Sequence, residues 1–267
     1  MDTFTSHNVL LPGGECTIPG TPLLADGPYV RSILRTLDIA FAGDVAGKSI
    51  VDLGCLEGGW TVEFARAGFN ALGIEARKLN VEKCQYVADR VNLPNLRFVL
   101  DDVRNIDDHG PFDAVFCAGL LYHLDSPTAY IRTLASATRR LLLLHTHFSR
   151  LHDTPLEDGQ ELTPSQRYQL SPIDTHEGNL GRWYPEYPRG EGDDEVEQRL
   201  WASYGNHRSF WIEKCHLLQT LRNVGFAPVY EQFDWVSDNV TDDFIHQHDR
   251  SLFVAYRGVE PLEPGTT

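Results

Sequence analysis

From Ser49 onward, short apolar runs alternate with stretches of helical periodicity, and this rhythm is the strongest constraint on the fold. The spacing predicts strands over 49–54, 71–75, 96–100, 112–117 and 140–147, with helices over 59–67, 79–91 and 126–138. Repeated strand–helix units build a mostly parallel sheet, and right-handed crossovers place helices on both of its faces. A helix over 28–42 precedes this unit, and a helix over 210–224 with strands over 228–234 and 250–257 follows it. The sequence therefore predicts a doubly wound α/β fold.

A glycine-containing turn follows the first predicted strand, in the segment Asp52-Leu-Gly-Cys-Leu-Glu-Gly58. Glycines let the backbone approach a ligand closely, and the N-terminus of the next helix offers unpaired amides. Glu75 ends the second strand about twenty residues later, where a carboxylate can accept hydrogen bonds from both ribose hydroxyls. The third strand ends at Asp101-Asp102-Val103, where a carboxylate can accept a hydrogen bond from the exocyclic amine of an adenine. Three such features at three strand ends predict a nucleotide-type site at this edge of the sheet.

These motifs resemble those of the class I S-adenosylmethionine (SAM)-dependent methyltransferases. The resemblance covers about 49–148, including the fourth-strand segment Phe112–Leu124, and extends more weakly to the last helix and two strands. It implies a seven-stranded sheet with an antiparallel last strand, SAM as the cofactor and S-adenosylhomocysteine (SAH) as the product. The cofactor-binding residues that it implies are Asp52, Gly54, Leu56, Gly58, Glu75, Ala76, Asp101, Asp102, Val103 and Ala118. Leu56 stands where the family's D-x-G-x-G-x-G motif has its central glycine, and its side chain would crowd the methionine moiety.

Three other interpretations use the same motifs. A nicotinamide-binding fold requires G-x-G-x-x-G, which the segment 54–59 does not supply. The segment 112–127 is also similar to the tRNA wobble-uridine carboxymethyltransferases, which act on a polyanion. A SAM-binding protein without catalysis is the third alternative, because Leu56 replaces a glycine of the cofactor motif.

The formal net charge of −15 at pH 7 disfavours binding to a phosphate backbone, so we expect a small-molecule methyl acceptor and neither DNA nor RNA. The chain has no basic start followed by an apolar run, and no apolar stretch near the ~20 residues that span a bilayer, so no membrane partner is predicted. Five scattered cysteines without C-x-x-C spacing predict reduced thiols in a cytoplasmic protein. The sequence leaves a homodimer open.

Three histidines are candidate catalytic residues. Methyl transfer from a sulfonium is an in-line displacement, so the enzyme must align the acceptor and remove the proton of a hydroxyl or protonated amine. His123 follows the fourth strand, while His145 and His147 lie on one face of the fifth. The alternative for His123 is that it packs a loop. An H-x-H pair joined by His152 or Asp153 could bind a divalent metal, but this spacing is a weak signal and no metal is predicted.

The region 149–206 interrupts the strand–helix rhythm with several prolines and an acidic run, which is typical of a lid or insertion. Aromatic and hydrogen-bonding residues gather in and beside it, as in small-molecule pockets. The predicted acceptor-binding residues are Tyr122, Arg182, Trp183, Tyr204, Asn206, His207 and Trp211. Alternatively, these residues give the insertion a core of its own. Arg182 and Arg208 would suit an acceptor carboxylate or phosphate, or would neutralise the acidic run.

The predicted organisation has four parts: an arm and helix that cover the pocket (1–48), a SAM-binding core (49–148), an acceptor-binding insertion (149–206), and a closing helix and strands (207–258). The predicted function is transfer of the SAM methyl group to a small molecule. Oxygen is favoured over nitrogen as the acceptor atom, because the histidine-rich rim suits deprotonation.

Overall fold

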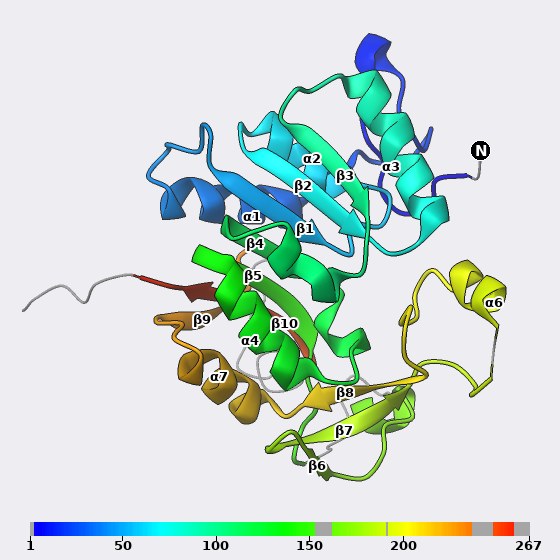
Figure 1. Cartoon of the computed structure of the whole chain (residues 1–267), viewed down its shortest axis with the longest axis vertical. Coiled ribbons are helices and arrows are strands. Elements are labelled where there is room, and N and C mark those ends of the chain that lie inside the picture. The colour runs from blue at the N-terminus through cyan, green and yellow to red at the C-terminus, as the bar shows by residue number, and fades with distance from the viewer. Residues whose placement is uncertain (1–2, 153–161, 191, 237–247, 259–267) are drawn as a thin grey trace, which may run out of the picture.

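The computed structural model describes residues 3–152, 162–190, 192–236 and 248–258. A seven-stranded sheet runs through the molecule, and a three-stranded sheet lies beside one of its ends (Figure 1). The strand order of the large sheet is β3-β2-β1-β4-β5-β10-β9. Strand β10 is antiparallel to both of its neighbours, and the other neighbouring pairs are parallel. The predicted doubly wound sheet with an antiparallel strand near its edge is therefore confirmed.

The strands of the large sheet follow the predicted apolar runs to within two residues at either end. They are β1 (Ser49–Leu53), β2 (Asn70–Glu75), β3 (Leu96–Leu100), β4 (Phe112–Ala118), β5 (Thr138–His147), β9 (Val229–Gln232) and β10 (Arg250–Tyr256). Successive residues of a strand point to opposite faces, so Ile50 enters one core and Val51 the other. Continuous apolar runs arise here because both faces of the sheet are covered.

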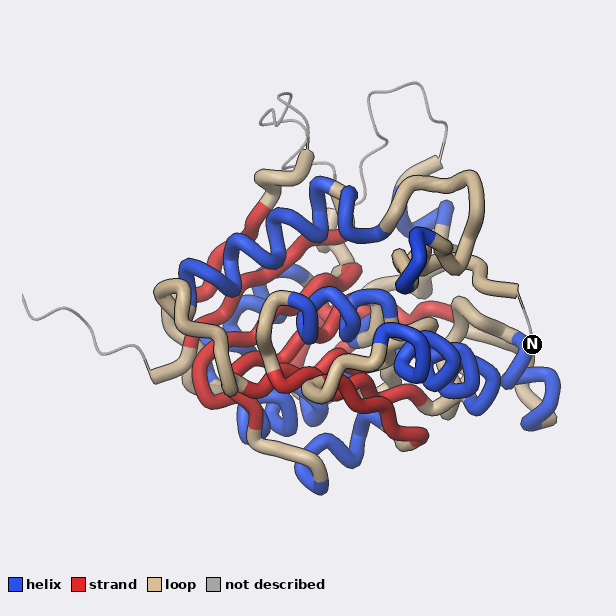
Figure 2. Tube along the Cα trace, turned by 90° about the horizontal axis from the view of Figure 1, so that it is seen from above, coloured by secondary structure: helices blue, strands red, loops and turns tan. Residues whose placement is uncertain are grey.

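Helices lie on both sides of the strands (Figure 2). The long helices are α1 (Pro28–Ala40), α2 (Gly59–Arg66), α3 (Lys78–Val91), α4 (Pro127–Ala137) and α7 (Lys214–Asn223). Helices α1, α2 and α3 bury Ile33, Val62 and Val87 in one core, whereas α4 and α7 bury Ile131 and Leu217 in the other. Each such side chain contributes about 1.5–3 kcal/mol when it leaves water. None of the described helices is long and apolar enough to cross a membrane.

Short 3₁₀ helices connect several of these elements. They are η1 (Pro12–Gly14), η2 (Leu24–Asp26), η3 (Val103–Asp108) and η4 (Leu121–His123). The last two follow β3 and β4 directly, and they hold the segments that the sequence predicts to face the ligand.

The insertion after β5 forms a sheet of its own. It contains α5 (Pro164–Arg167), β6 (Asp174–His176), β7 (Asn179–Pro185), α6 (Asp193–Gln198) and β8 (Arg208–Ile212), with β6, β7 and β8 antiparallel. Two backbone hydrogen bonds dock it on the main domain, from Phe210 N to Leu124 O (3.0 Å) and from Ser149 N to Ile212 O (3.0 Å). The insertion is thus fixed next to the segment that follows β4.

The predicted start of the helix over 210–224 is wrong. Residues 210–212 belong to β8, and α7 begins at Lys214. The Glu213 carboxylate accepts hydrogen bonds from the Cys215 and His216 amides, and this cap sets the first helical residue. Bulky aromatic residues before the cap favour a strand, because they pack against β7.

The N-terminal arm folds over the glycine turn. The fully buried Glu57 side chain accepts hydrogen bonds from the amides of residues 5–7 and from Lys83 Nζ. His7 Nδ1 accepts a hydrogen bond from Gly59 N, 3.1 Å away, at the first turn of α2. Burial lowers the pKa of His7 to about 4, so the imidazole is neutral and keeps the lone pair that this bond needs.

Candidate active site

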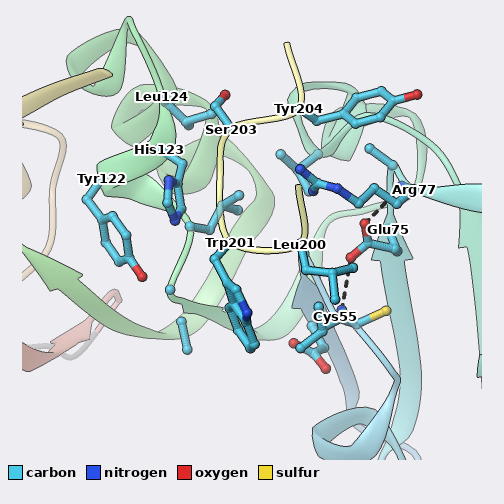
Figure 3. Close-up of a pocket in the computed structure, with 18 of the residues that line it drawn as sticks. Cys55, Glu75, Arg77, Tyr122, His123, Leu124, Leu200, Trp201, Ser203 and Tyr204 are labelled. Atoms are coloured by element: carbon cyan, nitrogen blue, oxygen red, sulfur yellow. Dashed lines mark hydrogen bonds between the residues drawn. The ribbon is translucent and has the colours of Figure 1, made fainter. Parts of the chain in front are cut away.

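A cavity of about 450 Å³ opens at the C-terminal ends of β1, β2, β4 and β5 (Figure 3). Its walls come from the N-terminal arm, the start of α1, the glycine turn, the segments after β2, β3 and β4, and the loop over 200–205. A concave site of this size, with a few converging polar groups, is of the kind that holds a small ligand. The position at the carboxyl edge of a parallel sheet is the one that the sequence predicts.

Glu75 is the buried acid at the centre of one half of this cavity. Its carboxylate oxygens accept hydrogen bonds from the backbone amides of Leu56 and Arg77, each at 2.9 Å (Figure 3). Burial raises the pKa of Glu75, and these amides oppose the shift by stabilising the ionised form. The two bonds fix the carboxylate and leave lone pairs for the hydroxyls of a ribose.

The glycine turn keeps its shape despite the leucine in it. Gly54 and Leu56 both line the cavity and both have left-handed backbones, with φ of +67° and +53°. That conformation costs a residue with a side chain roughly 1–2 kcal/mol, and the hydrogen bond from Leu56 N to Glu75 helps to hold it. The backbone at Leu56 therefore adopts a conformation that glycine favours, and the Leu56 side chain is an addition to the wall of the cavity.

Gly58 does not line the cavity and has a packing role. Its φ is +79°, and a Cβ at this position would lie 2.7 Å from Phe98 Cζ. Glycine is needed here because α2 crosses β3 too closely for any side chain.

The acids at the ends of β1 and β3 lie in three different environments. Asp52 lines the cavity beside Ala118 and accepts a hydrogen bond from Thr61 Oγ1 at 2.7 Å, and burial raises its pKa to about 7. Asp102 lines the cavity with Val103, whereas Asp101 turns away and lies 2.7 Å from His109 Nε2. Asp102, which also accepts hydrogen bonds from Arg104 N and Nη1, is therefore the acid of this pair that faces the cavity. Ala76 lines the cavity next to Glu75.

His123 lines the opposite half of the cavity and is held by a buried acid. Its Nδ1 lies 2.9 and 3.0 Å from the two oxygens of Glu186, whose side chain is 1% exposed. A carboxylate partner favours the tautomer with the proton on Nδ1, which leaves the lone pair on Nε2. Glu186 is itself fixed by Ser209 Oγ (2.7 Å) and Ser203 N (2.9 Å). This pair is the arrangement expected of an oriented general base.

The other two histidines of β5 have different surroundings. His145 lines the cavity, but burial and then the Arg250 charge lower its pKa to about 3, which makes it a weak base at neutral pH. His147 does not line the cavity, because its ring stacks on Trp211 with centroids 4.6 Å apart. Of the three predicted histidines, His123 is therefore the one that lines the cavity with a carboxylate partner.

Of the predicted acceptor-binding residues, Tyr122 and Tyr204 line the cavity. Trp211 lies behind Tyr122 and donates a hydrogen bond from Nε1 to its carbonyl oxygen (2.9 Å). Asn206 donates from Nδ2 to His123 O (3.0 Å), so it supports the segment that carries the histidine.

The remaining three predicted residues, Arg182, Trp183 and His207, lie within the insertion and do not line the cavity. Arg182 donates to the carbonyl oxygens of Arg150 and Ser171, Trp183 Nε1 donates to Asp174, and His207 Nε2 accepts from Arg189. Arg208 likewise lies over the Trp183 ring at 3.9 Å. These contacts correspond to the alternative in which the insertion builds its own core.

Several cavity residues have no prediction from the sequence, notably Tyr29, Trp60, Arg77 and Arg250. Arg77 holds the loop over 200–205 across the mouth of the cavity, because its Nη2 donates to the carbonyl oxygens of Arg199 (2.7 Å) and Ala202 (2.8 Å). In Figure 3 this loop crosses between the His123 side and the Glu75 side. A signal for Arg250 does exist, because the first residue of an antiparallel last strand must lie at the ligand-binding edge.

Within the described part of the chain, no three His, Cys, Asp or Glu side chains gather so as to hold a metal ion. Asp153, which the alternative metal site would use, lies outside the described residues.

Comparisons with known proteins agree with the fold. A family model described as a methyltransferase domain matches residues 27–231. The chain is 29% identical over 130 residues to a tRNA U34 carboxymethyltransferase of Wolinella succinogenes, covering 47% of this chain and 44% of that protein. It is 25% identical over 116 residues to a ubiquinone biosynthesis O-methyltransferase of Acinetobacter baumannii, covering 43% of this chain and 48% of that protein.

Among solved structures, the N-terminal domain of EvdMO1, crystallised in the presence of SAH and D-fucose, has a similar fold. Its TM-score is 0.63 at 23% identity, over 92% of this chain and 88% of that one. The chain spans less than half the length of the curated relatives it matches.

Proposed function

The chain belongs to the class I SAM-dependent methyltransferases, and we propose that it transfers the SAM methyl group to an oxygen atom of a small molecule. The observation that carries the choice of oxygen is the His123–Glu186 pair in the wall of the cavity. An alcohol or phenol must lose its proton as it attacks, and a carboxylate-oriented imidazole can accept that proton.

The residues of the other half fit SAM. Glu75 would accept hydrogen bonds from the ribose hydroxyls and Asp102 a hydrogen bond from the adenine amine, and residues 54–56 of the turn would face the amino-acid end. When bound, SAM supplies an electrophilic methyl group on a sulfonium. Tyr122 and His123 would then form the wall against which the acceptor is aligned, and the loop over 200–205 would exclude water from it.

In the proposed mechanism, Nε2 of His123 takes the hydroxyl proton of the methyl acceptor. Glu186 then stabilises the imidazolium that results. Ser209 and the Ser203 amide hold Glu186 in place, because both donate hydrogen bonds to its oxygens. Only interactions that strengthen as the proton moves accelerate the reaction, and the charge pair of imidazolium and carboxylate is such an interaction.

The test is incubation of the protein with ¹³C-methyl-labelled SAM and a small-molecule extract, followed by NMR of the labelled products. The carbon shift separates O-methyl from N-methyl groups. We expect O-methyl products, with turnover reduced by about 100-fold or more in His123→Ala and by about 10-fold in Glu186→Gln. His176→Ala, a histidine of β6 outside the cavity, is the control. Full turnover in His123→Ala with SAH binding retained, or N-methyl products alone, would refute the assignment.

A polyanionic acceptor is the competing proposal, since the name of one relative describes an enzyme that modifies tRNA. The net charge of −15 opposes it. Micromolar, salt-sensitive binding of bulk tRNA in a filter assay would replace the small-molecule proposal.

A further inference from the structure

Arg250 is the first residue of β10 and lies in the wall of the cavity. Because β10 runs antiparallel to β5, its first residue pairs in register with His147, at the end of β5. The strand direction therefore brings a cation to the edge where the parallel strands end. A Cβ on Gly119 would lie 3.6 Å from both Arg250 Nη2 and Tyr122 Oη, so the bare glycine keeps the space beside the guanidinium open.

Among the described residues, Arg250 has no ion-pair partner, and its buried Nε has no hydrogen-bond partner. Its chain neighbour Asp249 lies against His147 instead, with Oδ1 and Nδ1 3.5 Å apart. The other two arginines of the cavity are engaged: Arg77 with backbone carbonyls, and Arg104 with Asp102 (2.9 Å) and Asn206. A partly buried guanidinium whose Nε is buried without a partner is costly, which points to an anionic ligand.

A second polar group beside Arg250 also lacks a partner. The Tyr29 hydroxyl is buried and makes no hydrogen bond with the described residues. Its ring contacts Trp60 edge-on at 5.2 Å and His145 at 5.0 Å. Burial raises the pKa of Tyr29, and the positive charge of Arg250 opposes that rise, so the phenol stays protonated and can donate.

The electrostatics of the cavity differ between its two halves. Its acids, Asp52, Glu75 and Asp102, lie at or just after the C-terminal ends of β1, β2 and β3, on the cofactor side. The groups around Arg250 are Tyr29, Tyr122 and His145, and burial with the Arg250 charge lowers the pKa of His145 and keeps it neutral. One unbalanced positive charge and one hydroxyl donor match a single carboxylate better than a dianionic phosphate.

We propose that Arg250 and Tyr29 bind a carboxylate of the methyl acceptor, so that the substrate is a flat monocarboxylic acid whose ring or conjugated plane lies among Tyr29, Trp60 and Tyr122. The guanidinium fork takes the two carboxylate oxygens, and the Tyr29 hydroxyl donates to one of them. The aromatic walls select a planar body. This inference rests on the proposed function, because it names the acceptor of that same site.

The probe pair is benzoate and benzamide, which share shape and differ in charge. Each is titrated into the SAH-saturated protein, and binding is followed by calorimetry or by saturation-transfer NMR. We expect benzoate to bind at least 10-fold more tightly than benzamide. In Arg250→Gln the two affinities should come within 2-fold of each other, and Tyr29→Phe should lower the ratio about 3-fold. Arg132→Gln, which removes an exposed arginine of α4, is the matched control and should keep the full ratio.

Equal binding of the two probes by the unchanged protein, or an undiminished preference in Arg250→Gln, would overturn the carboxylate subsite. SAH affinity is measured first and reports on the proposed function separately. If SAH fails to bind, the methyltransferase mechanism fails, and titration of the ligand-free protein still decides the anion subsite. If SAH binds and benzoate shows no preference, only the acceptor class is wrong.

Discussion

Replacement of Asp52 by asparagine tests the electrostatics of the cofactor half directly. Asp52 lies one residue before the end of β1 with its side chain buried, and burial raises its pKa from an ordinary 3.8 to about 7. Thr61 donates a hydrogen bond to it and Glu75 adds negative charge nearby, but desolvation dominates. Asparagine keeps the shape and an acceptor oxygen for Thr61, and it cannot ionise.

The sign of the effect follows from proton uptake. Between pH 3.8 and about 7 the folded protein keeps the Asp52 proton and the unfolded chain does not, so this residue's contribution to stability falls as pH rises. From pH 5 to pH 8 the loss amounts to about 2.5 kcal/mol. The lowered pKa values of His7 and His145 act in the opposite direction, since stability from them is lost as pH falls through their unfolded value of 6.5.

The measurement is urea unfolding of the ligand-free protein and of Asp52→Asn at several pH values from 5 to 8. Both proteins share the histidines, so the difference between their unfolding free energies isolates Asp52. From pH 5 to pH 8, we expect the unfolding free energy of Asp52→Asn to rise by about 2.5 kcal/mol relative to that of the unchanged protein. Curves that stay parallel to within about 0.5 kcal/mol would mean that Asp52 titrates as an exposed acid, and the argument from burial would be refuted.

Two further predictions concern the turn and the loop over the cavity. Gly58→Ala should destabilise the fold by about 2–4 kcal/mol in urea unfolding, because it adds a clash with Phe98 to the cost of a left-handed backbone. Gly14→Ala, with φ of +88° and no atom near its Cβ position, should cost only about 1 kcal/mol, and equal losses would contradict the packing argument. Arg77→Gln should speed SAH release about 10-fold, because two hydrogen bonds to the loop are lost, and Trp201 fluorescence in stopped flow would report it. An unchanged release rate would mean that the loop is held by other contacts.

The sequence predicts the sheet and the cofactor edge well for a physical reason. The turn, Glu75 and Asp102 each lie at the C-terminal end of a strand, and neighbouring parallel strands bring these ends together whatever the loops do. The same logic fails for Gly58 and Asp101, since the local pattern cannot tell which of two adjacent polar or small residues turns toward the cavity. Contacts with Phe98 and His109 decide that, and these contacts link different elements.

The acceptor half was not predictable in the same way, because its groups come from segments far apart in the chain. Tyr29 precedes the first strand, Glu186 belongs to the insertion, and Arg250 begins the last strand. In the sequence Glu186 looks like any other acid near the run over 191–197, and only the docking of β8 on the segment after β4 brings it to His123.

Arg250 differs from Glu186 in this respect, because a topological rule leads to it. In a parallel sheet closed by one antiparallel strand, the entrance to that strand lies at the edge where its neighbours end. A charged residue at that entrance therefore faces the ligand site, even when nothing around it in the sequence suggests a function. Applied to this chain, the rule places Arg250 in the wall of the cavity, where the proposed acceptor carboxylate would bind.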